Sequence, residues 1–265
     1  MHLVVDVGNT ETAIGLLETE ELEIGTSWRV STAVSRTGDE WRLLLGSLLA
    51  ETEAPAIERV TVASVVPSVT DALLGGLRSI ARGPVLLVET DSPLPIRLDV
   101  EEPRTVGADR IVNTLAASQL YRRDTIVVDL GTATTYDCIT ADGVFLGGII
   151  APGVQAGQDW LSGRTAKLPR VELRPPERVI GRRTEACLQS GIFYSAVDAV
   201  DGIVDRIRKE WGREEALVVA TGGYASVLAP YSRTVEKVEP LLTLLGLALA
   251  GRHVAEVQEE GVDSL

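Results

Sequence analysis

Two short stretches of the sequence place an aspartate, a glycine and small polar residues directly after an apolar run. The first is "VVDVGNT" at residues 4–10, and the second is "VVDLGTATT" at residues 127–135. Each run of β-forming residues predicts a strand, so the carboxylates of Asp6 and Asp129 should lie at strand ends. A glycine two positions later lets the chain turn sharply and lets its backbone N–H groups approach a ligand.

The polar residues of these turns suit a phosphate group and its counter-ion. Backbone amides and the hydroxyls of Thr10, Thr132 and Thr134 can donate to phosphate oxygens. The two carboxylates suit a cation, because negative charges beside a phosphate are otherwise unfavourable. A single Asp-x-Gly turn is a common structural feature. Two copies after matching strands, one in each half, predict a paired nucleotide clamp, and the sequence has no Gly-x-x-x-x-Gly-Lys loop to do this instead.

A third glycine turn follows a strand-like run in "VVATGGYASVL", at residues 218–228. Strand–Gly–Gly–helix junctions often reflect packing alone. After two phosphate-type turns, however, Gly222 and Gly223 predict close backbone approach to the adenosine part of a nucleotide at the start of a helix.

The elements around these turns predict an α/β protein of two similar halves, residues 1–115 and 116–265. Apolar runs ending in turns predict strands, and residues such as Trp41, Leu45 and Leu48 recur at helical spacing. We expect Ser68 to cap the helix after residue 67, with Asp71 completing a capping box. The Asp142-Gly143 dipeptide predicts a hairpin turn. The leucine-rich stretch at 241–249 predicts a buried closing helix.

Composition excludes several classes of function. The 265-residue chain carries a net charge of −13, which opposes binding to nucleic acid. No apolar run reaches the roughly 18 residues of a membrane span. The N-terminus shows no basic segment followed by an apolar stretch and cleavage site. We therefore expect a cytoplasmic protein with no nucleic-acid partner and no membrane association.

The ordered set of motifs resembles a known family across residues 4 to about 246. The three turns resemble the acetate and sugar kinase, heat-shock ATPase and actin superfamily. More closely, the chain is similar to type III pantothenate kinases, also called the Bvg accessory factor family. The matching segments are "DVGNTETAIGL", "ASVVPSV", "VGADRIVN", "DLGTATTYDCI", "GGIIAPGV", "TAKLPRV", "IGRRTEACLQSGIFY" and "TGGYASVL". The implied fold is two duplicated actin-like (ribonuclease H-like) α/β domains, with helices flanking mixed sheets and a nucleotide cleft between the halves.

The resemblance also implies an activity: ATP-dependent phosphorylation of pantothenate to 4'-phosphopantothenate, the first step of coenzyme A biosynthesis. It implies Mg²⁺, a monovalent cation (K⁺ or NH₄⁺) at Asp129, an ATP contact from Thr132, and a homodimer with the substrate pocket near its interface. The first turn of the family holds the ATP phosphates, and the matching residues here are Asp6, Val7, Gly8, Asn9, Thr10, Glu11, Thr12 and Ala13. Pantothenate contacts match Gly107, Ala108, Asp109, Arg110 and Thr184, with Asp109 as the catalytic base.

The chemistry of these residues agrees with the resemblance. Phosphoryl transfer needs positioning, charge neutralisation and an acceptor for the hydroxyl proton, and an aspartate at a helix start can be that acceptor. Arg110 can hold an anionic group or neutralise phosphate charge. Taken alone, "GADR" is more typical of a capped helix start with a surface ion pair, and the other motifs favour the catalytic interpretation. Thr184 can similarly serve as a helix N-cap, and that role is compatible with a substrate contact.

Three positions depart from the family pattern and concern the substrate pocket. Val100 stands where an aromatic residue usually covers the substrate, Arg183 where asparagine is common, and Ser195 where glycine is usual. Two alternatives to a pantothenate kinase therefore stay open: a non-catalytic, nucleotide-binding regulatory member of the same fold, and a kinase for another small hydroxy acid.

Overall fold

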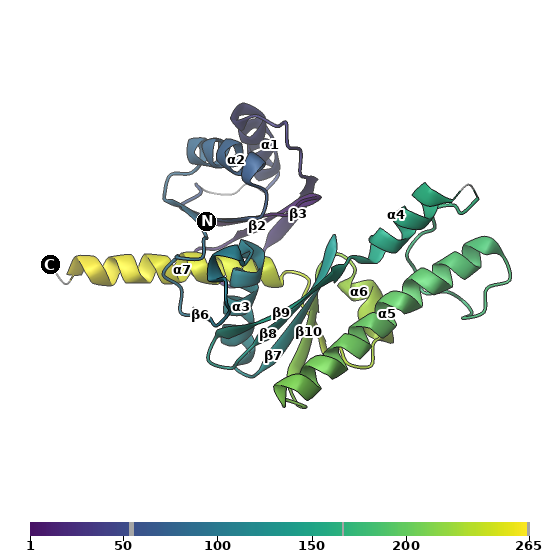
Figure 1. Cartoon of the computed structure of the whole chain (residues 1–265). Helices are drawn as coiled ribbons and strands as arrows, with labels where there is room; N and C mark the ends of the chain where they lie inside the picture. Colours follow the sequence, from purple (N-terminus) through teal and green to yellow (C-terminus); the bar gives the residue numbers. More distant parts are fainter. Residues whose placement is uncertain (53–55, 166, 264–265) are drawn as a thin grey trace. The chain divides into compact units, whose positions relative to one another are not determined.

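The computed structural model describes residues 1–52, 56–165 and 167–263, which form two compact units (Figure 1). The first unit contains residues 1–120 and the chain from residue 241 onward, and the second contains residues 121–240. This division differs from the expected halves at the C-terminus. Helix α7 (Leu242–Asp263) packs on β1 (His2–Val7) and β4 (Arg59–Ser64) of the first unit. Gly251 of α7 makes this packing close, because an added Cβ would lie 2.7 Å from the His2 ring.

The first unit is built on a five-stranded mixed sheet in the order β3-β2-β1-β4-β5. β1 is antiparallel to β2 (Glu11–Leu17) and parallel to β4, while β3 (Thr26–Ser31) and β5 (Val85–Leu87) are the outer strands. The inner strands are nearly continuous apolar runs, and their side chains are buried. This burial on both faces is typical of central strands covered by helices.

Helices α1 (Gly38–Ala50) and α2 (Pro67–Ile80) pack against each other and share the core of this sheet. A capping box between Thr37 and Glu40 starts α1. The prediction that Ser68 caps α2 is wrong: the N-cap is Val66, whose side chain makes no capping bond, and Pro67 occupies the first turn. Proline is favoured there because its missing N–H needs no helical partner. Beyond β5 lie β6 (Arg97–Leu98), the 3₁₀ turn η1 (Pro103–Thr105) and α3 (Ala108–Tyr121).

The second unit repeats this plan with the strand order β11-β10-β7-β8-β9. β7 (Thr125–Leu130) is antiparallel to β8 (Ala133–Ile139) and parallel to β10 (Leu217–Thr221). β9 (Val144–Pro152) is antiparallel to β8, and β11 (Lys237–Val238) is the outer strand beside β10. The Asp142-Gly143 hairpin between β8 and β9 is confirmed, with Gly143 at a φ of +82°. The internal repeat is therefore confirmed: β1, β2 and β4 correspond to β7, β8 and β10.

Long helix α5 (Thr184–Trp211) covers one face of the second sheet, and Phe193, Val197 and Val200 join its core. Figure 1 shows α4 (Val154–Arg164) and the first half of α5 projecting beyond the strands of this unit. Short α6 (Ala225–Leu228) and the 3₁₀ turn η2 (Ala229–Tyr231) follow β10. Among the described residues, no helix combines the length and the apolar character needed to cross a bilayer.

Candidate active site

The first predicted turn joins β1 to β2 as a tight hairpin. Asp6, one position before the end of β1, pairs with Ala13 of β2 and Ala63 of β4. The backbone N–H of Gly8 donates to the carbonyl of Glu11 at 3.0 Å, which closes the turn. The three residues at its tip are exposed, so their amides and polar groups are accessible to a ligand: Asn9, Thr10 and Glu11. Of the other predicted ATP contacts, Val7 and Thr12 are fully buried, and Ala13 is half-buried.

Thr32, a residue that sequence reasoning missed, braces this turn from the end of β3. Its hydroxyl donates to the carbonyl of Gly8 at 2.7 Å and lies 3.0 Å from the hydroxyl of buried Thr12. Its backbone N–H donates to the carbonyl of Thr10 at 2.9 Å. Thr12 therefore supports the turn from behind. The sequence carried no signal for this brace, since Thr32 becomes a neighbour only through the register of β2 and β3.

The predicted base lies at the same edge of the first sheet as this turn. Val65, just after β4, donates its N–H to the carbonyl of Val7 at 3.1 Å. Gly107 lies against Val65, because a Cβ added to the glycine would be 3.4 Å from the valine side chain. That Cβ would also lie 2.5 Å from Oδ1 of Asp109, so the glycine leaves the carboxylate its space. Parallel β1 and β4 thus bring the first turn and the start of α3 to one edge.

The environment of Asp109 suits a proton acceptor. Burial raises the pKa of its carboxyl above the ordinary value, and a hydrogen bond from the backbone N–H of Arg110 at 2.8 Å and the Arg110 charge oppose this only in part. A raised pKa makes a carboxylate a stronger base. Beside it, Ala108 is buried and Arg110 is half-buried. Val100 is half-buried in the segment between β6 and η1.

The second turn, between β7 and β8, repeats the first. Asp129 pairs with Thr135 of β8 and Thr221 of β10. The N–H of Gly131 donates to the carbonyl of Ala133 at 3.1 Å, and Thr132 is exposed at the tip. This matches the placement of Asp6 between an antiparallel and a parallel neighbour.

The third turn lies directly beside the second. Gly222 follows β10 with a φ of +87°, and the N–H of Tyr224 donates to the carbonyl of Leu130 at 3.1 Å. The structure thus brings Asp129, Thr132 and the Gly222-Gly223 pair together at one edge of the second sheet.

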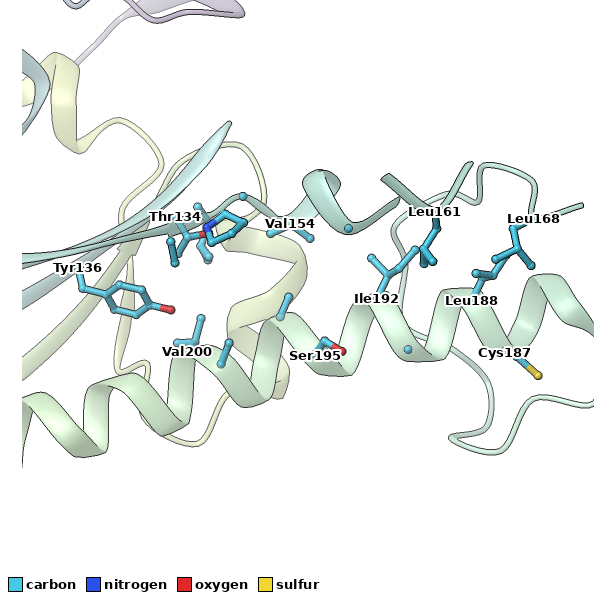
Figure 2. Close-up of a pocket in the computed structure, with 18 of the residues that line it drawn as sticks. Thr134, Tyr136, Val154, Leu161, Leu168, Cys187, Leu188, Ile192, Ser195 and Val200 are labelled. Carbon is cyan, nitrogen blue, oxygen red and sulfur yellow. The ribbon is translucent and has the colours of Figure 1, made fainter. Parts of the chain in front are cut away.

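An apolar groove of about 550 Å³ runs along α5 in the second unit (Figure 2). Figure 2 shows Thr134 and Tyr136 at its sheet end, Ser195 and Ile192 along its length, and Cys187 and Leu168 near the start of α5. Leu130 also lines the sheet end, next to the second turn. Sequence reasoning missed this groove, although it quoted the segments that form it.

Thr184 lies at the far end of this groove, as the first residue of α5. The N-cap is Arg183, and its side chain makes no capping bond, so the suggestion that Thr184 caps the helix is wrong. The preceding loop folds back on α5 instead. The hydroxyl of Ser190 donates to the carbonyl of Val179 at 2.6 Å, and Gly181 lies so close to the first turn of α5 that an added Cβ would overlap its backbone. This leaves Thr184 exposed.

The donor atoms at the strand ends fit hard cations. Asp6 and Asp129 offer carboxylate oxygens beside turns that suit phosphate, and oxygen ligands are those that Mg²⁺ and K⁺ prefer. Across the described part of the chain, no three His, Cys, Asp or Glu side chains gather as a metal cluster.

The chain is similar to known proteins over most of its length. Residues 2–206 match the family model described as type III pantothenate kinase. A type III pantothenate kinase from Syntrophotalea carbinolica is 46% identical over 94% of this chain and 97% of its own length. One from Moorella thermoacetica is 44% identical over 94% of this chain and 98% of its own.

Solved structures show the same fold at low identity. A Baf family protein from Campylobacter jejuni superposes with a TM-score of 0.59 at 17% identity, covering 97% of this chain and 99% of that one. An inorganic polyphosphate/ATP-glucomannokinase from Arthrobacter gives 0.51 at 16% identity, covering 96% and 98%. The actin-like kinase fold expected from the sequence is therefore confirmed.

Proposed function

The chain belongs to the type III pantothenate kinase family, and we propose that it transfers the γ-phosphoryl group of ATP to the primary hydroxyl of pantothenate. The products are ADP and 4'-phosphopantothenate, and the reaction is the first step of coenzyme A biosynthesis. The observation that carries the proposal is the half-buried carboxylate of Asp109, held at the same sheet edge as a phosphate-type turn. A protein that only bound nucleotide would have no need of such a base.

In this proposal Asp109 accepts the proton of the pantothenate hydroxyl as its oxygen attacks the γ-phosphorus. The bond between that phosphorus and the β,γ-bridging oxygen breaks, and ADP leaves with the electron pair. Gly107, Ala108 and Arg110 contact the substrate beside this base, and the Arg110 guanidinium balances its negative charge. Val100 covers the substrate with a smaller apolar surface than an aromatic residue would provide. These assignments rest on family resemblance and on the place of each residue in the first unit.

The turns hold the nucleotide. Exposed backbone amides at Asn9, Thr10 and Glu11, with the side chains of Asn9 and Thr10, bind phosphate oxygens, and Thr132 contacts ATP from the second turn. The backbone of Gly222 and Gly223 approaches adenosine. Asp6 would hold Mg²⁺ through the phosphates, and Asp129 would hold K⁺ or NH₄⁺. When bound, these cations neutralise the charge that phosphoryl transfer develops.

We also propose that the protein works as a cytoplasmic homodimer through the projecting part of the second unit. Three large apolar side chains in this part or next to it are strongly exposed: Ile150 of β9 at 67%, Trp160 of α4 at 63% and Ile180 of the loop before α5 at 82%. Thr184 lies about 24 Å along α5 from Val200 at the sheet end of the groove, given a rise of 1.5 Å per residue. Thr184 is therefore remote from the second turn of its own chain, which supports a pantothenate contact near a dimer interface.

A coupled ADP-release assay tests the function. Purified protein with ATP and Mg²⁺ should release ADP when pantothenate is added, and more rapidly with K⁺ than with a bulky organic cation. Nucleotide binding with no ADP release would favour the regulatory alternative. Release with other small hydroxy acids but not with pantothenate would favour the second alternative, to which the departures at Val100, Arg183 and Ser195 point.

Sedimentation tests the homodimer. The wild type should sediment as twice 28.3 kDa. Trp160→Asp should shift it toward the monomer and weaken pantothenate binding, with nucleotide binding retained. Glu177→Gln, at another exposed position of the projecting part, is the control. A fully active wild-type monomer would contradict the proposal.

A further inference from the structure

Gly222 occupies a position where no other residue fits beside Asp129. An added Cβ would overlap Oδ1 of the Asp129 carboxylate and would lie 2.8 Å from both the backbone N and the carbonyl carbon of Leu130. Real Cβ atoms essentially never approach another heavy atom below 3.0 Å. A side chain at residue 222 would therefore displace either the carboxylate or the end of β7.

The backbone of Gly222 adds a second, independent requirement for glycine. Its φ of +87° lies in the region that L-residues rarely adopt. Gly131, the glycine of the Asp129 turn itself, is less constrained, because its Cβ would make an ordinary contact of 3.5 Å with the same oxygen. The residue that confines the carboxylate thus comes from the turn after the neighbouring strand β10, 93 positions later in the chain than Asp129.

Gly153 confines the other side of the same turn. It is the N-cap of α4, and an added Cβ would overlap the carbonyl oxygen of Thr132 and lie 2.6 Å from that of Gly131. Its φ of −67° is open to any residue, so only the close approach requires glycine. The hydrogen bond from Tyr224 to the Leu130 carbonyl ties the turn to the Gly222 side.

We propose that Gly153 and Gly222 form a glycine clamp, a pair of positioning residues for the turn at residues 129–132. Gly222 sets the direction of the Asp129 carboxylate toward its cation, and Gly153 sets the Gly131–Thr132 backbone against the nucleotide phosphates. The proposal rests on the proposed function, since it concerns how these groups bind their ligands. Backbone atoms packed this closely leave the turn little freedom to move. Protein groups that are already fixed lose little conformational entropy when the ligand binds to them.

The test of the Gly222 half compares two alanine variants at positive φ. Gly222→Ala carries both the backbone strain and the overlap with Asp129. Gly212→Ala carries only the strain, because Gly212 has a φ of +68° and no heavy atom lies within 4 Å of an added Cβ. We would measure the melting temperature with ADP while titrating K⁺, a readout that does not depend on turnover. The half-saturating K⁺ concentration should rise about tenfold or more in Gly222→Ala, equivalent to about 1.4 kcal/mol, and stay at the wild-type value in Gly212→Ala.

The test of the Gly153 half uses a matched glycine of α4. Gly153→Ala should weaken ADP binding about tenfold, again equivalent to about 1.4 kcal/mol. Gly163→Ala should bind ADP as the wild type does, since no heavy atom lies within 4 Å of its added Cβ. Equal affinity in these two variants would overturn this half of the proposal.

A double mutant separates positioning from a general structural defect. If Gly222 acts through Asp129, then adding Gly222→Ala to Asp129→Asn should not weaken K⁺ binding further. If Gly222→Ala does not fold, Asp129→Ala in the same chain should restore part of the lost stability by removing the overlapped carboxylate, while the close approach to the Leu130 backbone remains. An additive effect in the first case, or no rescue in the second, would overturn the coupling.

The outcome for the wild type distinguishes failure of the clamp from failure of the function. A wild type that does not phosphorylate pantothenate contradicts the proposed function. An active wild type whose melting does not respond to K⁺ overturns the cation role of Asp129 and the Gly222 half with it. An active, K⁺-responsive wild type with an unchanged K⁺ midpoint in Gly222→Ala overturns the Gly222 half alone.

Discussion

The first and second turns have the same topology but are held by different means. At the first turn, the hydroxyl of Thr32 donates to the Gly8 carbonyl and lies beside the hydroxyl of Thr12. At the second, backbone atoms of Gly153 and Gly222 approach so closely that no side chain would fit. One turn is supported by side-chain hydrogen bonds, and the other by close backbone contact.

The two halves also differ in the helix that follows the last strands of each repeat. In the first half this helix, α3, begins at Ala108 within the Gly-Ala-Asp-Arg stretch of residues 107–110. In the second half it is α7, and residues 240–243 there read Pro-Leu-Leu-Thr. The first copy therefore carries a polar, ionisable helix start, and the second an apolar one. The two halves carry similar turns, and we infer that they diverged so that only the first half accepts the proton, while the monovalent cation binds to the second.

The largest expected effect is on Asp109, which has no counterpart in the second half. Asp109→Asn keeps the shape of the side chain and removes the base, so turnover should fall by about 10²–10⁴-fold. Nucleotide affinity should stay at the wild-type value, because the phosphate contacts lie in the turns. Turnover and ADP affinity of the purified variant check both statements. A folded variant with near-native turnover would show that Asp109 is only a helix-start residue. The proposed difference in catalytic role between the two halves would then be wrong.

The same variant should be more stable than the wild type at neutral pH. Because burial raises the pKa of Asp109, the folded state disfavours its charged form, and the ionised group lowers the free energy of unfolding as the pH rises through the folded pKa. Asn carries no such charge. The gain in melting temperature should be present at pH 7, should fade as the pH falls through the raised pKa of the folded state, and should be lost at the ordinary aspartate pKa of 3.8. A variant less stable than the wild type at pH 7 would contradict this view of the site.

The carboxylates of the two turns should bind different cations. Asp129→Asn should raise the K⁺ concentration needed for half-maximal turnover by about tenfold, or about 1.4 kcal/mol. Asp6→Asn should instead raise the Mg²⁺ requirement and leave the K⁺ requirement unchanged. Titrating each ion at saturating levels of the other separates the two roles. Equal effects of both variants on both ions would show that the turns are functionally equivalent.

A pH effect on stability should arise in the first unit from His2. Burial, followed by the charges of Arg59, the N-terminus and Arg252, lowers the pKa of His2 to about 3, and Thr61 is its hydrogen-bond partner at 2.8 Å. The unfolded chain therefore binds an additional proton as the pH falls below the ordinary value of 6.5, and the free energy of unfolding decreases between pH 6.5 and about 3. Chemical denaturation across this range should show a shallower decrease for His2→Gln than for the wild type, with His253→Gln as the control. Identical slopes for His2→Gln and the wild type would contradict the assignment of this pH dependence to His2.

The smallest expected effect concerns the hydroxyl brace. Thr32→Val should lower the free energy of unfolding by about 1 kcal/mol, because the Gly8 carbonyl loses its donor. In the Thr32→Val variant, the further change Thr12→Val should lower the free energy of unfolding by less than it does in the wild type, since the two hydroxyls share one contact. Urea denaturation measures all three variants, and Ser47→Ala, which removes an exposed hydroxyl from α1, is the control. Additive losses would mean that the brace is not a coupled unit.

Sequence alone was sufficient for the features that depend on neighbouring residues in the chain. Apolar runs ending in Asp-x-Gly predicted both strand turns, and alternation of strands and helices predicted the α/β class. The ordered motifs predicted the family and therefore the actin-like fold. These signals are local because strand formation, turn chemistry and helix periodicity act over a few residues.

Tertiary structure decided the features that depend on which distant segments become neighbours. Thr32 supports the first turn because β3 pairs with β2 in one register, and Gly222 meets Asp129 because β10 pairs with β7. Helix α7 packs on the first sheet although it follows the second, because Gly251 can lie against His2 and Thr61. No local pattern encodes such contacts, since a glycine that allows close approach has the same letter as one that only bends the chain.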